Sequence, residues 1–185
     1  MESSSPYAAQ VALRYTRTAI ALHWLLALLI GGKLALGLYM TELAFSMARL
    51  KFYNWHKWAG AVILALSAAR LVWRLLHRPP PSPPMPPWQR RAARVTHALL
   101  YTLFFGVPLA GWAYSSASGF PLLVFGVLPL PDWVGVDRQL ADVLKPLHKW
   151  LALSLAALVL VHVAAAVKHH LVDRDGLLKR MRPAF

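Results

Sequence analysis

Four long stretches of the sequence are almost entirely apolar, and the polar residues gather between them. The stretches cover residues 18–41, 52–76, 91–115 and 146–171, and each holds twenty or more residues. A helix rises about 1.5 Å per residue and needs about 20 residues to cross the hydrocarbon core of a bilayer. The pattern therefore predicts an all-α integral membrane protein, a four-helix bundle that forms a single domain over residues 1–185.

The connections between these stretches differ in character. Residues 77–90 read HRPPPSPPMPPWQR and hold seven prolines, which predicts an exposed polyproline-like strap because proline lacks the backbone donor of a helix. Pro108 falls inside the third stretch, and we expect it to kink that helix rather than to end it. Residues 119–145 form a long, semi-polar loop in which we expect a short surface helix over residues 137–144.

Lysine and arginine are distributed unevenly between the two ends of the predicted helices. Thirteen of them lie at the end that carries both termini and the strap, and six lie at the other end. Such residues favour the cytoplasmic side of a membrane. We therefore expect both termini and the strap to be cytoplasmic and the 119–145 loop to be external. The net charge of +13 has the same explanation and does not indicate a nucleic-acid partner. The charges flank apolar stretches instead of forming a basic stripe.

Histidines occur within the apolar stretches at two depths. His23 lies about one turn inside the first stretch, and His56 lies about one turn inside the opposite end of the second. The fourth stretch carries both His148 and His162, which are 14 residues apart. That separation is about 21 Å along a helix, and a bundle helix with about 3.5 residues per turn places both on one face. The depths predict two stacked pairs, an outer pair of His56 with His148 and an inner pair of His23 with His162.

Paired histidines at these depths favour haem over the other groups that histidine binds. A lone histidine in a membrane can simply bond a neighbouring helix, but ionisable groups inside a bilayer are costly and indicate function by default. Zinc would lack ligands, because each level offers two histidines and the spans hold no carboxylates. The chain has no cysteine, which excludes thiolate-ligated iron–sulfur clusters and covalent haem attachment. Haem needs only two axial ligands and an apolar slot.

The surroundings of the histidines carry a resemblance to a known family. The motifs are ALHW at His23, NWHKWAG at His56, LHKWLA at His148 and VLVHVAAAVKHH at His162. Over nearly all of its length the chain resembles the bacterial cytochrome b561 family of four-helix, di-haem, quinone-reactive proteins of the inner membrane. The resemblance implies two haems b, with His23 and His162 as axial ligands of one and His56 and His148 as axial ligands of the other.

Other residues near these motifs are candidates for supporting roles. Lys57 and Lys149 follow two of the histidines and either neutralise propionates of the outer haem or snorkel to the membrane surface. His97 lies at the inner level and could replace an inner ligand, although the resemblance implies a bond to a propionate or to quinone instead. His169 lies seven residues beyond His162, on nearly the same face, and the resemblance implies that it binds quinone. Lys33 lies inside the first stretch, where it either snorkels outward or faces an outer-haem propionate or a small anionic donor.

The function that the resemblance implies is electron transfer across the membrane. A periplasmic donor, superoxide in the best-understood branch, would reduce ubiquinone near the cytoplasmic side, and the chain would be an oxidoreductase. The alternative is a haem-bearing anchor subunit that takes electrons from a partner dehydrogenase or a soluble cytochrome. The expected partners are thus membrane lipid, ubiquinone, and either a small anionic donor or an electron-donor protein.

Overall fold

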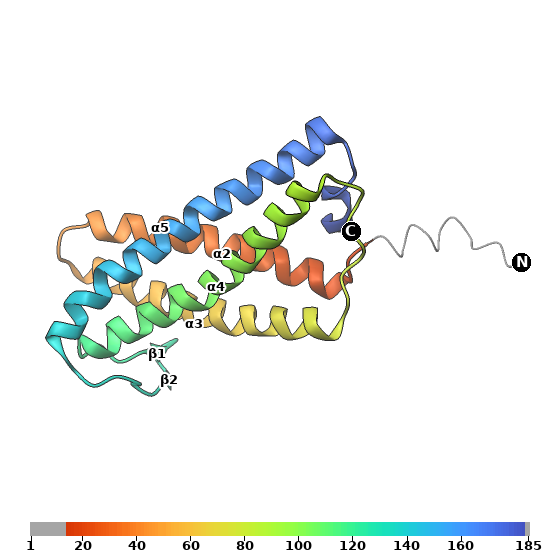
Figure 1. Ribbon diagram of the computed structural model, residues 1–185. Coiled ribbons are helices and arrows are strands. Elements are labelled where there is room, and N and C mark those ends of the chain that lie inside the picture. Colours follow the sequence, from red (N-terminus) through yellow and green to blue (C-terminus); the bar gives the residue numbers. More distant parts are fainter. Residues whose placement is uncertain (1–13, 184–185) are drawn as a thin grey trace, which may run out of the picture.

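Four long helices run side by side through the computed structural model, which describes residues 14–183 (Figure 1). They are α2 (Arg17–Glu42), α3 (Met47–Leu76), α4 (Pro87–Ala117) and α5 (Arg138–Lys168). Each is long and apolar enough to span a membrane, and only 6–17% of the residues in their most apolar windows are buried. Apolar side chains that face outward over such lengths suit lipid contact. The predicted membrane bundle of four helices is confirmed.

Short polar side chains begin three of these helices. Thr16 accepts a hydrogen bond from the Ala19 amide, Ser46 accepts one from the Arg49 amide, and Asp137 accepts one from the Leu140 amide. Each bond satisfies a backbone donor that has no partner within the first turn. The remaining helix, α4, begins instead with a proline at its first position, where no backbone donor is needed.

Two helix boundaries differ from the sequence prediction. The helix α5 begins at Arg138, so the separate surface helix expected over residues 137–144 is wrong: those residues form its first turns, capped by Asp137. Pro146 lies within α5 and removes one backbone hydrogen bond without ending the helix. The helix α4 begins at Pro87, inside the expected strap, and continues through Pro108 as predicted.

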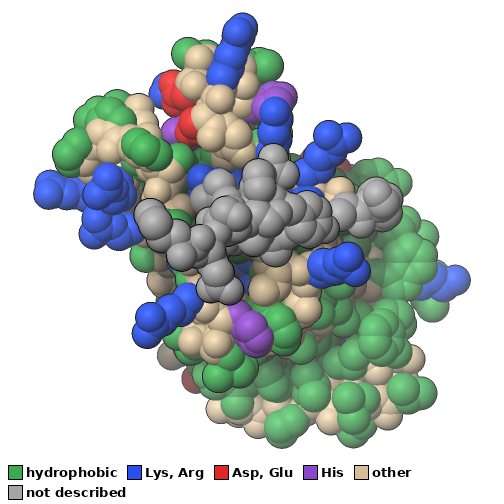
Figure 2. Space-filling view, turned by 90° about the vertical axis from the view of Figure 1, so that its right-hand side faces the viewer, with side chains coloured by type: hydrophobic (Ala, Val, Ile, Leu, Met, Phe, Trp, Pro, Cys, Tyr) green, Lys and Arg blue, Asp and Glu red, His purple; other side chains and the backbone are tan. Residues whose placement is uncertain are grey.

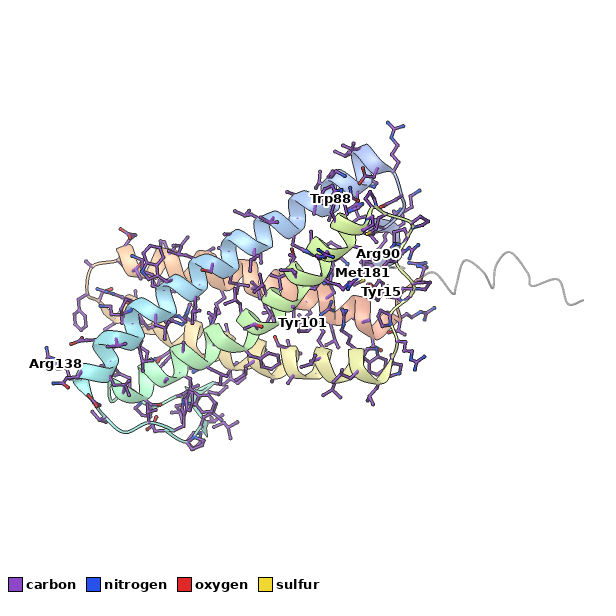
Figure 3. The ribbon with its side chains drawn as sticks, viewed as in Figure 1. Tyr15, Trp88, Arg90, Tyr101, Arg138 and Met181 are labelled. Atoms are coloured by element: carbon purple, nitrogen blue, oxygen red, sulfur yellow. The ribbon has the colours of Figure 1, made fainter. Side chains whose placement is uncertain are left out.

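The two ends of the bundle carry different connections. One end, here the hairpin end, holds the α2–α3 turn and the α4–α5 loop, in which β1 (Leu123–Val124) pairs antiparallel with β2 (Leu128–Pro129). The other, the strap end, holds the proline strap and both described ends of the chain (Figure 1). Figure 3 shows Tyr15 and Met181 together at the strap end and Arg138 at the hairpin end.

The C-terminal segment folds back across the strap end. After α5 it forms a π turn (η1, His169–Asp173) and a 3-10 turn (η2, Leu178–Met181). The Trp24 indole donates to the Met181 carbonyl at 2.8 Å, and the Arg180 guanidinium donates to the Pro81 carbonyl at 2.6 Å. These bonds tie the segment to α2 and to the strap. Lysine and arginine side chains surround this end of the molecule (Figure 2).

The buried core lies midway between the two ends. Leu155 on α5 belongs to it and is seven residues from both His148 and His162. Backbone packing joins α2 to α3, α3 to α4 and α4 to α5, whereas α5 makes little backbone contact with α2 or α3 in the described chain. Side chains, and not close backbone contact, must therefore occupy or border the space between α5 and the helices α2 and α3. The buried members of the core are Leu26, Ile30, Ile63, Leu100, Val107 and Leu155.

Candidate functional site

The structure brings together both histidine pairs that the depths predict. The ring centres of His56 on α3 and His148 on α5 are 6.2 Å apart, and those of His23 on α2 and His162 on α5 are also 6.2 Å apart. Two imidazoles on opposite sides of one metal ion, each bonded at about 2.0 Å, place their ring centres roughly 6 Å apart. Each pair could thus hold one metal ion between its two rings.

His148 is held in one orientation by α4. Its Nδ1–H donates to the Val107 carbonyl at 3.0 Å, which leaves Nε2 as the nitrogen available to a metal. Metal-binding histidines usually donate their second nitrogen to a carbonyl or carboxylate in this way, since the bond fixes both the tautomer and the ring plane. The Val107 bond therefore fits a histidine that could hold a metal through Nε2.

His56 has polar atoms that nothing in the described chain satisfies. Both of its ring nitrogens are buried and form no hydrogen bond with any residue in 14–183. A buried polar atom without a partner costs about 1–3 kcal/mol, so such atoms are rare unless a ligand completes them. A metal bound through one nitrogen would account for half of this deficit at His56.

Two glycines make room for the outer pair of rings. A Cβ on Gly111 of α4 would lie 2.8 Å from His148 Cε1, and a Cβ on Gly37 of α2 would lie 3.1 Å from His56 Cε1. Glycine is costly within a helix relative to alanine, so close approach of a ring is the physical reason for these two. Both rings pack against helix backbone because the glycines lack side chains.

A large cavity adjoins the outer pair at the hairpin end. Its volume is about 600 Å³, within the usual range for a cofactor pocket. His56, His148 and Lys57 line it, as does Trp112, whose buried indole N–H has no acceptor among the described residues. Lys57 also donates to the Pro121 carbonyl at 3.2 Å. Lys149 is exposed on α5 and does not line the cavity.

The inner site holds three imidazoles rather than two. The ring centre of His97 on α4 is 5.5 Å from that of His162, which is closer than the ring centre of His23 at 6.2 Å. His23 and His162 are half-buried, whereas His97 is exposed. The spacing of His23 from His162 equals that of the His56–His148 pair, whereas His97 is closer to His162. His97 lies beside this pair, where it can bond a group held between the other two rings.

His169 lies in the π turn beyond α5, at the strap end. Its Nδ1–H donates to the Asp175 carboxylate at 2.6 Å, and Asp173 Oδ2 lies 3.1 Å from the same nitrogen. Lys168 forms a second ion pair with Asp173 at 2.7 Å. Because the carboxylates engage Nδ1, the ring can exchange a proton through Nε2. These contacts hold the ring plane and the tautomer of His169.

The chain matches known proteins along most of its length. Residues 14–184 fit the family model for prokaryotic cytochrome b561. The chain belongs to the prokaryotic cytochrome b561 family. Cytochrome b561 homolog 2 of Escherichia coli (strain K12) is 38% identical over 170 residues, 91% of this chain and 90% of that protein. "Probable superoxide oxidase CybB" of Yersinia pestis is 31% identical over 175 residues, 92% of this chain and 96% of that one.

A second Escherichia coli protein extends this similarity. Cytochrome b561 homolog 1 is 32% identical over 184 residues, which cover 92% of this chain and 97% of the relative. Membership in the cytochrome b561 family makes the chain a haem b-binding electron carrier and a multi-pass protein of the bacterial inner membrane. The residues present fit that cofactor: two imidazole pairs at ligand spacing, unsatisfied nitrogens on His56 and a large cavity.

Sequence reasoning missed several residues that shape the outer site. Gly37, Gly111 and the Val107 carbonyl contact its rings, but none of them has a distinctive sequence signal. Gly31 and Gly32 lie on the same helix as Gly37 and have open space where a Cβ would stand. A helical glycine in a membrane protein therefore does not by itself identify a cofactor contact.

Proposed function

We propose that this cytochrome b561 protein holds two haems b, one between His56 and His148 and the other between His23 and His162. The observation that carries the proposal is the equal ring spacing of 6.2 Å in both pairs. The pairs use different positions of α5, and the core with Leu155 lies between them. Each haem when bound supplies a one-electron centre, and the four histidines orient the two centres in sequence across the bundle.

The hairpin end suits a small anionic donor. Lys33, Arg49 and Lys57 line the outer cavity, and none of its lining residues in the described chain is Asp or Glu. A cavity with positive walls concentrates small anions by electrostatic focusing. A relative with 31% identity carries the name "Probable superoxide oxidase CybB". We infer that superoxide enters here, gives up one electron and leaves as dioxygen.

The strap end suits the acceptor. Ubiquinone takes two electrons and two protons to become ubiquinol, so two superoxide ions are consumed for each quinone. His169 can hold and move one of the protons through Nε2, because Asp175 engages its Nδ1. The thirteen lysines and arginines at this end against six at the other favour a cytoplasmic strap end and a periplasmic hairpin end.

Stopped-flow absorbance of the purified holoprotein tests this function. Mixing with superoxide is expected to reduce haem rapidly with no added protein, and a ubiquinone analogue should then reoxidise it. Lys57 and Arg49 draw the donor electrostatically, so the rate of reduction should fall as salt rises. Reduction that requires a co-purifying dehydrogenase or cytochrome would contradict the proposal and favour an anchor subunit.

The reoxidation phase of the same experiment separates the quinone end from the haems. His169→Ala should keep both haem spectra but slow reoxidation by quinone about tenfold or more, since positioned proton transfer contributes at least that much. His170→Ala is the matched control, because that side chain occupies the next position of the same π turn and is exposed. A larger defect in His170→Ala than in His169→Ala would refute the assignment.

A further inference from the structure

Lys33 points into the bundle instead of toward the membrane surface. It lies in the middle of α2, and its Nζ is 2.7 Å from the point that a Cβ on Gly60 of α3 would occupy. Lys33 also lines the outer cavity together with His56 and His148. Lysines within a span usually extend their flexible stem to the interface. The absence of a side chain at Gly60 gives this ammonium its place inside the bundle.

The depth of Lys33 follows from its neighbours on α2 and α3. Gly37 is level with His56, because a Cβ on Gly37 would lie 3.1 Å from that ring. Lys33 is one helical turn from Gly37, in the direction of His23. In the same way, Gly60 is one turn beyond His56 toward the core. The ammonium therefore lies on the side of the outer site that faces the inner site.

No carboxylate within residues 14–183 compensates this charge. Within residues 14–183 the Lys33 ammonium forms no hydrogen bond and no ion pair. The nearest acidic residue along α2 is Glu42, nine positions away at its end, which is about 13 Å along a helix. A cation inside a bilayer is costly enough to indicate a function. The remaining carboxylates lie near the chain ends, in the 119–145 loop or in the first turns of α5, at Glu2, Asp132, Asp137, Asp142, Asp173 and Asp175.

We propose that Lys33 sets the reduction potential of the outer haem by placing a fixed positive charge beside it. An electron that enters the outer site adds one negative charge, and a nearby cation stabilises that charge more strongly in a low-dielectric interior than in water. Lys33 thereby raises the potential of the haem at His56 and His148, which favours uptake of the electron from the donor. The inference rests on the proposed function, since it requires a haem at that pair.

A spectroelectrochemical titration of the purified holoprotein tests this role. The unchanged protein should show two one-electron waves, and the wave that disappears in His56→Ala belongs to the outer haem. In Lys33→Met the ratio of reduced to oxidised outer haem at a fixed ambient potential should fall at least tenfold, equal to a shift of about 59 mV for one electron. The inner wave should stay in place. Lys33→Gln removes the charge but keeps a polar group, and it should give the same shift.

The control variant removes one lysine charge from a side chain that is exposed to solvent. Lys51 is exposed in the first turns of α3, so Lys51→Met should leave both waves where they are, because solvent screens its charge. An outer wave that does not move in Lys33→Met and Lys33→Gln, or two waves that fall equally, would overturn the role of Lys33. A single wave in the unchanged protein would instead overturn the two-haem proposal itself.

Discussion

Replacing His148 with alanine is expected to remove the outer haem and to leave the inner haem with its spectrum intact. In the proposed assignment the two sites share α5 but no ligand, and Leu155 and the core separate His148 from His162. His162→Ala should do the reverse. Haem content per chain and the reduced-minus-oxidised spectrum of folded, purified protein measure both outcomes. Loss of both haems from either single variant that still folds would show that the sites are not independent.

His97 supplies the internal comparison for the inner site. Its ring is closer to His162 than the ring of His23 is, so distance alone would make it a rival ligand. We expect His97→Ala to retain two haems and His23→Ala to retain only the outer one. The opposite result would assign the inner iron to His97 and His162.

Substitution of Gly111, the glycine beside His148, is expected to have the second large effect on haem content. In Gly111→Ala the new Cβ would lie 2.8 Å from His148 Cε1, and the ring cannot retreat without losing its bond to the Val107 carbonyl. Overpacking of this kind costs about 1–3 kcal/mol, which corresponds to a loss of haem affinity of roughly 5- to 150-fold. We therefore expect purified Gly111→Ala to contain the inner haem and little of the outer haem.

Two further alanine substitutions make this prediction a graded series. Gly37→Ala would bring a Cβ to 3.1 Å from His56 and should weaken the outer haem less than Gly111→Ala. Gly106 lies on the same helix as Gly111 with nothing within 4 Å of its Cβ position, so Gly106→Ala should leave the haem content unchanged. Equal haem loss in Gly106→Ala and Gly111→Ala would mean that helix stability, and not ring contact, is responsible.

The sequence alone predicted the helices and the pairing of the histidines because both depend on regular spacing. Apolar runs of membrane-spanning length define the four spans, and the rise of a helix fixes the depths of His23, His56, His148 and His162. The start of α5 was harder to predict, because Pro146 disfavours a helix interior while the Asp137 cap favours a helix that begins earlier. The outcome depended on the balance of two local effects.

Contacts between helices were beyond what the sequence could supply. The direction of Lys33 depends on the missing side chain at Gly60 of another helix, and no spacing within α2 encodes that. The same holds for the Val107 carbonyl that orients His148 and for the distance of His97 from His162. Lys149 has the same sequence context as Lys57, yet only Lys57 lines the cavity.

The number of haems per chain is the most direct measurement of the central claim. Acid-solvent extraction, followed by haem and protein quantification, should give two haems for each chain, all of them extractable because the chain has no cysteine to bind haem covalently. The spectrum should be that of low-spin, six-coordinate iron, as expected for two histidines on each haem. A ratio near one, or haem that resists extraction, would contradict two bis-histidine sites.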